Sequence, residues 1–136
     1  MADTLKLEIV TPGATVYSED VHMVTLPAVE GQIGIFPHHV PLLTRIVPGE
    51  IMVRKDRHDD FLAVGEGLVE ITGGRVAIVT DMAVAAKDID EARAEEARQR
   101  AAARLRDKIS DEEVAAVNGA LARSLAQLRV KRRYRR

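Results

Sequence analysis

Hydrophobic and polar residues alternate with a period of two along about the first 85 residues. The segment LKLEIV alternates Leu5, Leu7 and Ile9 with charged residues, and the TPG that follows breaks the run. The segments DVHMVTLP, GEIMVRKD, FLAVGEGLVEIT and RVAIVTDMAV continue the series. A Gly73-Gly74 pair between β-branched runs predicts a tight hairpin turn, because glycine accepts the positive φ that such turns require. Short alternating segments bounded by turn residues predict an all-β sandwich or barrel.

From Asp88 onward the period becomes helical. The segment DIDEARAEEARQRAAARLRDKI begins with Asp88 as the predicted N-cap and has Glu91 three residues later, the spacing of a capping box. A second helix is predicted to begin at Ser110, with Glu113 at the same spacing. Each helix has one apolar stripe: Ala94, Ala97, Ala101 and Leu105 in the first, and Val114, Val117, Leu121, Leu125 and Leu128 in the second. Because only the short segment DKIS separates them, the helices are predicted to form an antiparallel hairpin.

The composition of this hairpin predicts that it is held weakly against the rest of the chain. Alanine faces bury little surface, so docking depends on a few Leu and Val side chains at about 1.5 to 3 kcal/mol each before entropy is subtracted. Alanine also favours the helix intrinsically, so the first helix is expected to stay helical when it undocks. The second half of the chain is therefore predicted to move as a unit.

Charge is distributed unevenly although the formal net charge is only -1. From Lys87 onward the chain has 14 of its 20 lysines and arginines but only 9 of its 21 acids. The stretch from Arg123 to Arg136 is basic and contains no acid, so it forms a basic arm at the C-terminus. The first half is acidic.

The sequence contains no recognisable catalytic motif. It has no cysteine, no GxSxG, no HExxH and no GxxxxGK[ST]. The adjacent His38 and His39 lie between two prolines, and a metal site there would need a partner such as His22, His58 or a carboxylate. A turn without metal is the preferred interpretation, so no metal site is predicted. No run approaches the roughly 18 apolar residues of a membrane span, so no direct membrane insertion is predicted.

The basic arm leaves a second class of function open. The segment RVKRRYRR has cations for phosphates and Tyr134 for stacking on a base. Arginine runs also serve as docking arms for acidic protein surfaces, and a single tyrosine is little aromatic content. A nucleic-acid-binding module is therefore the alternative hypothesis rather than the preferred one.

Five segments in order resemble one known family: LKLEIVTP, EGQIGIFPHHVPLLT, GEGLVEI before the Gly-Gly turn, DIDEARA and LARSLAQLRV. The chain resembles the epsilon subunit of bacterial F-type ATP synthase over nearly its whole length. The resemblance implies a ten-stranded β-sandwich at residues 1–86, which binds the gamma subunit and the polar loops of the c-ring. It implies a mobile, two-helix regulatory domain at residues 87–136. The implied protein is a non-catalytic rotor subunit of a proton-translocating complex, at the cytoplasmic face of the bacterial plasma membrane.

The resemblance also implies where the sandwich contacts its partners. The family's EGxxGxxPxHxPLL turn would face gamma and the c-ring, and the matched or neighbouring contact residues are Glu30, Gly31, Gln32, His38, His39, Pro41 and Leu42. Many relatives have an acid in place of Gln32 and glycine in place of His38. The loss of the acid removes one charge that could pair with the ring.

Two further expectations concern the helices. Relatives that bind regulatory ATP use an I/L-D-x-x-R-A motif, which corresponds here to Ile89, Asp90, Arg93 and Ala94, with Arg123 from the second helix; the other arginine position holds Gln127. ATP is the one candidate ligand, and no other cofactor is expected. When the helices extend, the resemblance implies contact with the alpha and beta subunits and inhibition of ATP hydrolysis. The arm residues are Arg123, Arg129, Lys131, Arg132, Arg133, Arg135 and Arg136.

Overall fold

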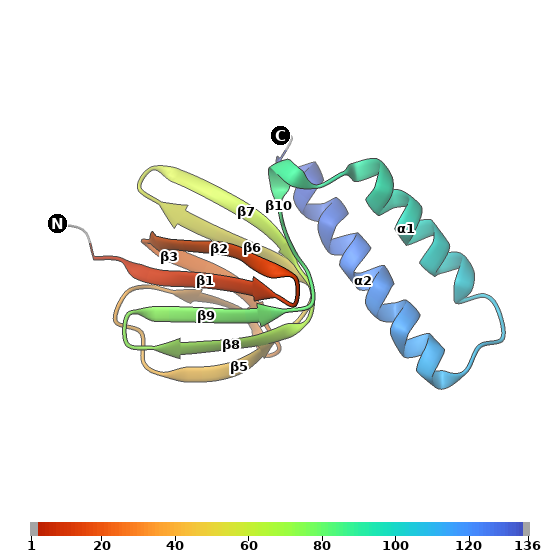
Figure 1. Cartoon of the computed structure of the whole chain (residues 1–136), viewed down its shortest axis with the longest axis horizontal. Helices are drawn as coiled ribbons and strands as arrows, with labels where there is room; N and C mark the ends of the chain where they lie inside the picture. The colour runs from red at the N-terminus through yellow and green to blue at the C-terminus, as the bar shows by residue number, and fades with distance from the viewer. Residues whose placement is uncertain (1–2, 135–136) are drawn as a thin grey trace.

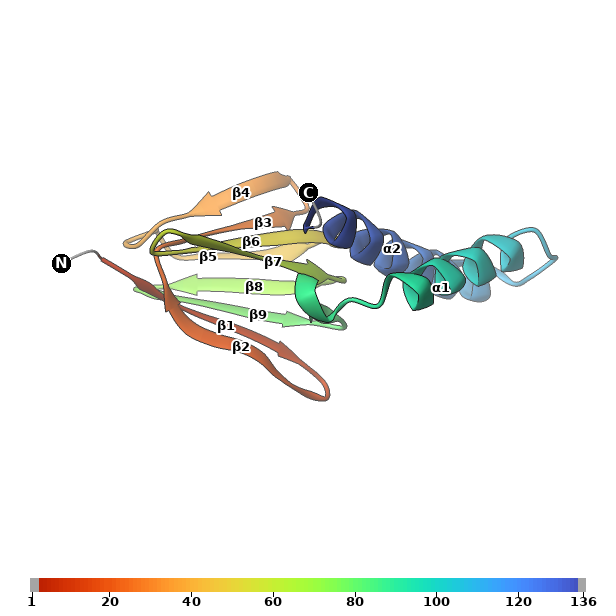
Figure 2. The same cartoon turned by 90° about the horizontal axis from the view of Figure 1, so that it is seen from above.

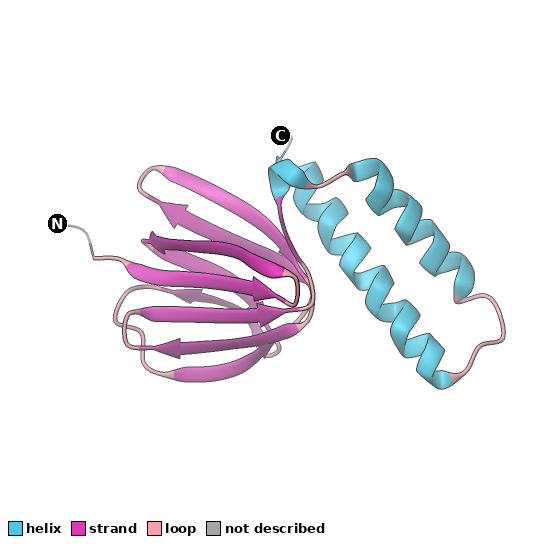
Figure 3. Ribbon diagram, in the orientation of Figure 1, coloured by secondary structure: helices cyan, strands magenta, loops and turns pink. Residues whose placement is uncertain are grey.

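The computed structural model describes residues 3–134, which form ten strands, one 3-10 turn and two α-helices (Figure 1). The strands are β1 (Leu5–Thr11), β2 (Ala14–Val21), β3 (Met23–Ala28), β4 (Gly31–Ile35), β5 (Leu42–Ile46), β6 (Gly49–Lys55), β7 (His58–Val64), β8 (Gly67–Thr72), β9 (Arg75–Thr80) and β10 (Ala83–Ala85). They are followed by η1 (Ala86–Asp88), α1 (Glu91–Arg104) and α2 (Asp111–Tyr134). Strands and helices occupy separate halves of the molecule (Figure 3). The predicted ten-stranded β-sandwich followed by a helical hairpin is confirmed.

The strands form one hydrogen-bonded path, β10-β7-β6-β3-β5-β8-β9-β1-β2, with β4 paired to β3. Seen from above, β3 to β7 lie in one layer and β1, β2, β8 and β9 in the other (Figure 2). The path passes from one layer to the other where β5 pairs with β8. All pairs are antiparallel except β1 with β9. The alternation seen in the sequence therefore turns one face of each layer inward.

The core lies between the two layers and consists of large aliphatic side chains. Its fully buried members include Leu7, Ile9, Leu26, Ile35, Ile46, Ile51, Leu62 and Ile78. Burying side chains of this size contributes about 1.5 to 3 kcal/mol each. The sandwich thus has a complete core without the helices.

Glycines permit a tight turn and a close approach of two backbones in the sandwich. The Gly73-Gly74 turn joins β8 to β9 as predicted, and of the two only Gly74 has a positive φ, of 58°. Gly67 begins β8 in register with Thr80 of β9. A Cβ at Gly67 would lie 2.0 Å from the Val79 carbonyl oxygen, so the backbones approach too closely for any side chain.

The start of α1 differs from the prediction. Asp90, not Asp88, is the N-cap: its carboxylate accepts the Arg93 N–H at 3.1 Å. Asp88 lies in η1, where the Ile89 N–H donates to the Ala86 carbonyl at 3.3 Å. Because Asp88 is part of this 3-10 turn, it cannot be the N-cap of α1, and the predicted capping box between Asp88 and Glu91 does not form.

The connection between the helices is longer than predicted. The helix α1 ends at Arg104, two residues before the predicted DKIS connection, because Arg106 and Asp107 donate to the carbonyls three residues before them. The start of α2 is as predicted, since the Glu113 N–H donates to Ser110 Oγ at 3.2 Å. The hairpin projects from one end of the sandwich, with its 105–110 connection farthest away (Figures 1 and 2). Within residues 3–134, no helix is long and apolar enough to cross a membrane.

Only the C-terminal part of α2 packs on the sandwich. Its buried residues are Ser124, Ala126, Leu128 and Val130, and Ala126 and Val130 cluster with Ala63, Ala86 and Ile89. The predicted stripe was wrong at Leu125, which is 42% exposed. Helix α2 contacts both α1 and the sandwich, so its buried surface is wider than the single stripe assumed from the sequence.

Candidate functional site

The predicted contact segment begins near the hairpin end of the sandwich and runs along β4 to the opposite end (Figure 2). It comprises residues 30–42, which we call the foot, and it runs from β4 to the start of β5. Figure 2 shows β4 directed toward the end where the N-terminus lies, and the helices project from the other end. His38 lies at the N-terminal end, since its Nε2 is 3.1 Å from Asp3 Oδ2.

The foot contains two unusual backbone positions. Gly31 has a φ of 128° and His38 a φ of 68°. The value at His38 is left-handed, a conformation that glycine adopts without cost and other residues seldom do. A glycine at position 38, which the family resemblance led us to expect, would adopt this geometry without steric cost.

The remaining foot residues present polar and apolar groups to solvent. Glu30 accepts from Thr44 Oγ1 at 3.1 and 3.2 Å, and His39 Nδ1 lies 2.6 Å from its neighbour's carbonyl oxygen on Val40. Gln32, Pro41 and Leu42 are exposed. Across residues 3–134 there is no group of three or more histidine, aspartate or glutamate side chains positioned to hold a metal ion.

A larger apolar surface continues from the foot along the outside of β5, β8 and β9. Leu43 is 66% exposed, Leu68 50% and Val79 59%. Leu68 pairs with Arg45 on one side and with Val79 on the other, so these side chains share one face of the sheet. Phe36 and Val40 in the foot are 62% and 71% exposed. We call Phe36, Val40, Leu43, Leu68 and Val79 the outer apolar face.

Sequence reasoning missed the part of this face that lies on β8 and β9. In RVAIV, Val76 and Ile78 point into the core while Ala77 and Val79 point outward. Apolar residues on both sides of a strand are the signal that was available, since a solvated strand face is normally polar. A sandwich of this size seldom exposes such a face without a partner.

A groove of about 550 Å³ lies between the helices and the segment that leads into them. Four of the five predicted ATP-binding residues line it: Ile89, Asp90, Arg93 and Ala94. Gln127 also lines it, and its amide lies 2.9 Å from Met82 Sδ. The fifth predicted residue, Arg123, does not line the groove.

Arg123 instead forms an ion pair with Asp81, with 3.3 Å between Nη1 and Oδ2. The groove is lined by Arg93 and Arg100 but also by Asp88, Asp90 and Glu96. Its charged residues therefore do not favour a polyphosphate strongly, and the carboxylate of Asp90 is already engaged in capping α1.

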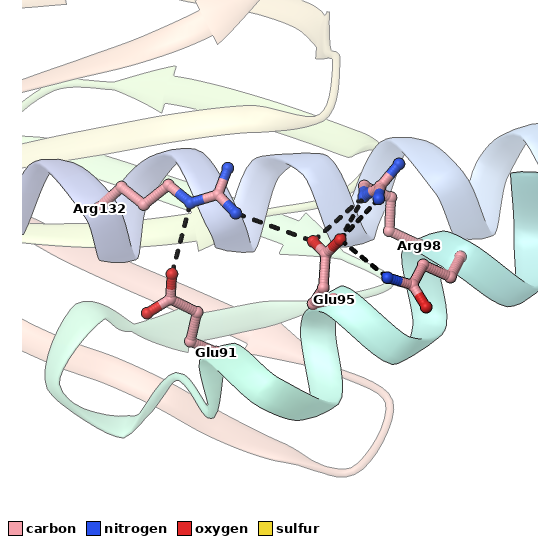
Figure 4. A network of polar contacts seen from close by, with 5 residues as sticks. Glu91, Glu95, Arg98 and Arg132 are labelled. Atoms are coloured by element: carbon pink, nitrogen blue, oxygen red, sulfur yellow. Dashed lines mark hydrogen bonds and ion pairs between the residues drawn. The ribbon is translucent and has the colours of Figure 1, made fainter.

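Four residues of the basic arm, Arg123, Lys131, Arg132 and Arg133, contact acceptors of the same chain. Arg132 reaches Glu91 at 3.3 Å and Glu95 at 3.7 Å, and Glu95 also binds Arg98 (Figure 4). Arg133 pairs with Glu50 at 2.6 Å. Lys131 Nζ donates to the Ala86 carbonyl at 3.2 Å. Arg129 is exposed on α2, and Arg135 and Arg136 lie outside the described residues.

Two carboxylates in this region have shifted pKa values. The hydrogen bond from Arg98 lowers the pKa of Glu95. Burial raises the pKa of Glu50, although the positive charges of Arg133 and Arg129 oppose the rise. The side chain of Glu50 is only 16% exposed, and its Oε2 is buried without a hydrogen-bond partner. Glu50 therefore carries a desolvation cost where the hairpin meets the sandwich.

Comparisons with known proteins cover almost the whole chain. The family model described as "ATP synthase, Delta/Epsilon chain, beta-sandwich domain" matches residues 4–86, and "ATP synthase, Delta/Epsilon chain, long alpha-helix domain" matches residues 87–132. An ATP synthase epsilon chain from Halorhodospira halophila is 41% identical over 128 residues, covering 93% of this chain and 91% of that protein. One from Herpetosiphon aurantiacus is 44% identical over 126 residues, covering 93% of each chain.

Solved structures show the same fold at lower identity. A chain of the Euglena gracilis mitochondrial ATP synthase (OSCP/F1/c-ring) has a TM-score of 0.73 at 21% identity, covering 88% of this chain and 76% of that one. A chain of the Tetrahymena thermophila mitochondrial ATP synthase (central stalk/c-ring) has a TM-score of 0.66 at 13% identity, covering 93% of this chain and 96% of that one.

Proposed function

The chain belongs to the delta/epsilon family of ATP synthase subunits, and from that membership we propose that it couples rotation of the c-ring to ATP synthesis and restrains ATP hydrolysis through its helices. It is an epsilon chain, a stalk subunit without a catalytic role. The proposed partners are the gamma subunit and the polar loops of the c-ring, with the alpha and beta subunits as additional partners when the helices extend. The proposed location is the cytoplasmic face of a bacterial plasma membrane, held there by the complex.

The observation that carries the proposal is the outer apolar face. Its five large side chains are between 50% and 71% exposed. Charged residues adjoin it: Arg45 lies opposite Leu68, and Glu70 lies opposite Leu43. An apolar centre with a polar rim is typical of a protein interface. We assign this face to gamma.

The foot is assigned to the junction between gamma and the c-ring. His38 and His39 provide polar groups there, next to Phe36 and Val40 of the outer apolar face, while Glu30 lies at the other end of β4. Gln32 is exposed on β4 and offers a hydrogen-bonding amide in place of a charge. Ring contact is therefore proposed to depend on shape and hydrogen bonding more than on an ion pair at position 32.

The hairpin is assigned the inhibitory role. Its basic arm is held by ion pairs that are partly exposed, and such pairs are worth about 0 to 1 kcal/mol each. An acidic surface on another subunit can therefore compete for these arginines. The alternative, in which the arm binds nucleic acid, gains no support from the relatives, which are ATP synthase epsilon chains.

Co-purification with gamma tests the assignment of the outer apolar face. Leu68→Asp and Val79→Asp are expected to abolish co-purification, because each places a charge in an apolar interface. Leu125→Asp is the matched control, since Leu125 is an exposed leucine on α2 outside the face. Retention of gamma by both face variants would refute the assignment.

His39→Ala is expected to weaken gamma or ring binding without changing the metal content from zero.

A truncation after residue 87 tests the inhibitory role. The shortened chain retains the complete core, so stalk assembly is expected to continue while ATP hydrolysis by the complex rises. Unchanged hydrolysis would refute the inhibitory part alone.

A salt titration of binding to duplex and single-stranded nucleic acid tests the alternative. Binding no stronger than that of a scrambled basic peptide would remove it.

A further inference from the structure

Hydrogen bonds within the sandwich fix the turn between β9 and β10, which places the carboxylate of Asp81 against Arg123 of the basic arm. Asp81 lies in this turn, and its N–H donates to the Glu66 carbonyl at 3.1 Å. The Gly65 N–H donates to the Met82 carbonyl at 2.9 Å. The hydroxyl of Thr80, which is buried, donates to the Glu66 carbonyl at 2.8 Å. These hydrogen bonds join the turn to the neighbouring β7–β8 turn, and none of them involves a helix.

Gly65 provides the space that the carboxylate occupies. A Cβ at Gly65 would lie 1.9 Å from Asp81 Oδ1 and 3.5 Å from Arg123 Cδ. Any larger residue would therefore displace the Asp81 side chain. The backbone of one turn and the absence of a side chain in the other together aim Asp81 at α2.

The arm residues that meet this segment are spaced along one side of α2. Arg123, Gln127 and Lys131 recur every four residues and contact Asp81, Met82 and Ala86 in that order. The segment 81–86 therefore runs beside α2 and engages its polar side chains one turn after another. Within this series, the pair between Arg123 and Asp81 is the only one of the three contacts in which both groups are charged.

We propose that Asp81 is an internal competitor for Arg123, which it holds in the docked hairpin and must release before the arm can bind an acidic surface of another subunit. The inference rests on the proposed inhibitory function and specifies its regulation. The ion pair is partly exposed, at 38% for Arg123 and 45% for Asp81, so it can exchange partners without burying a bare charge. The balance between docked and extended hairpins then depends on Asp81, which lies in the sandwich and not in the arm.

The competition predicts effects of opposite sign for the two partners of one ion pair. Asp81→Asn frees Arg123, so the hairpin undocks more easily and ATP hydrolysis by the assembled complex is expected to fall. Arg123→Gln also loosens docking, but it removes a cation of the arm, so hydrolysis is expected to rise. If Asp81 served only to stabilise the fold, the two variants would change hydrolysis in the same direction.

Docking is measured separately, in the isolated full-length chain. The chain has no cysteine, so Gly13→Cys and Lys108→Cys introduce two unique sites for a fluorescent donor and acceptor. The first lies in the β1–β2 turn at the hairpin end of the sandwich, and the second in the connection between the helices (Figure 1). Asp81→Asn and Arg123→Gln are each expected to lower the ratio of docked to undocked chains about two- to fivefold, as for a partly exposed ion pair. Raised salt is expected to lower the wild-type ratio toward that of the variants.

Asp59→Asn is the matched control, because it removes a carboxylate that pairs with Arg54 on the adjacent strand of the sandwich. A docked ratio for Asp81→Asn that equals this control overturns the proposal. A rise of hydrolysis in the Asp81→Asn complex also overturns it, whatever the docking result. Failure of the inhibitory function itself is distinguished by the truncation after residue 87, which then leaves hydrolysis unchanged while the docking measurement still reports on the ion pair.

Discussion

The sandwich and the helical hairpin bury surface in opposite ways. The sandwich encloses a continuous core of leucine, isoleucine and valine. The hairpin meets the sandwich through a small cluster, three of whose five buried members are alanines. The cluster consists of Ala63, Ala86, Ile89, Ala126 and Val130, with Phe61, Met82 and Val84 partly buried against it. Because hydrophobic stabilisation scales with the apolar area removed from water, the first region is stable by itself and the second is not.

Polar contacts supply much of what holds the hairpin in place. They join Asp81, Met82, Ala86 and Glu50 of the sandwich and η1 to side chains of α2. Hydrogen bonds and ion pairs can exchange one partner for another at little net cost, whereas an apolar core cannot open without exposing its surface to water. The difference suits one region to transmit force and the other to change position.

Truncating a core side chain tests the comparison most severely. Leu7→Ala is expected to lower the free energy of unfolding by about 2 to 5 kcal/mol, because Leu7 is fully buried between the layers. Val130→Ala, the counterpart on the hairpin, is expected to increase hydrogen exchange of the α2 amides while leaving the urea midpoint of the sandwich almost unchanged. Equal shifts of the urea midpoint would show that the two regions unfold as one unit.

Substitution of the two glycines in the VGEGL segment is expected to affect the sandwich and the hairpin differently. Gly67→Ala is expected to destabilise the sandwich by about 1 to 3 kcal/mol, because its Cβ would lie 2.0 Å from a backbone oxygen of β9 that cannot move aside. Gly65→Ala meets a side chain, Asp81, so it is expected to loosen the hairpin more than the sandwich. Urea unfolding and the docked fraction, measured on both variants, separate these effects. A larger stability loss for Gly65→Ala than for Gly67→Ala would contradict this.

The same contrast explains what the sequence could predict. Alternation over the strands depends on which face is buried, so an all-β sandwich or barrel and the Ser110 helix start were readable from local patterns, whereas the count of ten strands came from the family resemblance. The N-cap was placed wrongly at Asp88, because two aspartates precede the helix and the first of them ends a 3-10 turn, which leaves Asp90 in the cap position. The predicted grouping of Arg123 with the ATP motif did not form, since the competing carboxylate of Asp81 is 42 residues away along the chain. Contacts of this range leave no periodic signal.

His38 tests how much strain the stable region carries at its foot. His38→Gly is expected to raise the free energy of unfolding by about 1 kcal/mol, because His38 has a left-handed φ of 68° that glycine adopts without steric cost. His39→Gly, at the neighbouring position without a positive φ, is expected to destabilise slightly. Thermal unfolding of the two variants decides the matter. A loss of stability in His38→Gly similar to that in His39→Gly would mean that the foot backbone is not strained.

Glu50 lies where the two regions meet, and it predicts the smallest effect. Burial raises the pKa of Glu50 above its ordinary value of 4.5, so the folded chain binds a proton at this site more readily than the unfolded chain. The stability that this proton contributes is complete below pH 4.5 and is lost as the pH rises through the raised value. Glu50→Gln stays neutral and avoids the loss, so its stability relative to wild type is expected to increase with pH over that interval. Arg133 and Arg129 keep the difference small by favouring the charged form.

Urea unfolding between pH 4 and pH 7 measures this difference in stability between Glu50→Gln and wild type. The control is Glu70→Gln, which removes an exposed carboxylate on β8. A pH slope for Glu50→Gln that equals the wild-type slope would show that the boundary between the regions is wet enough to solvate the charge.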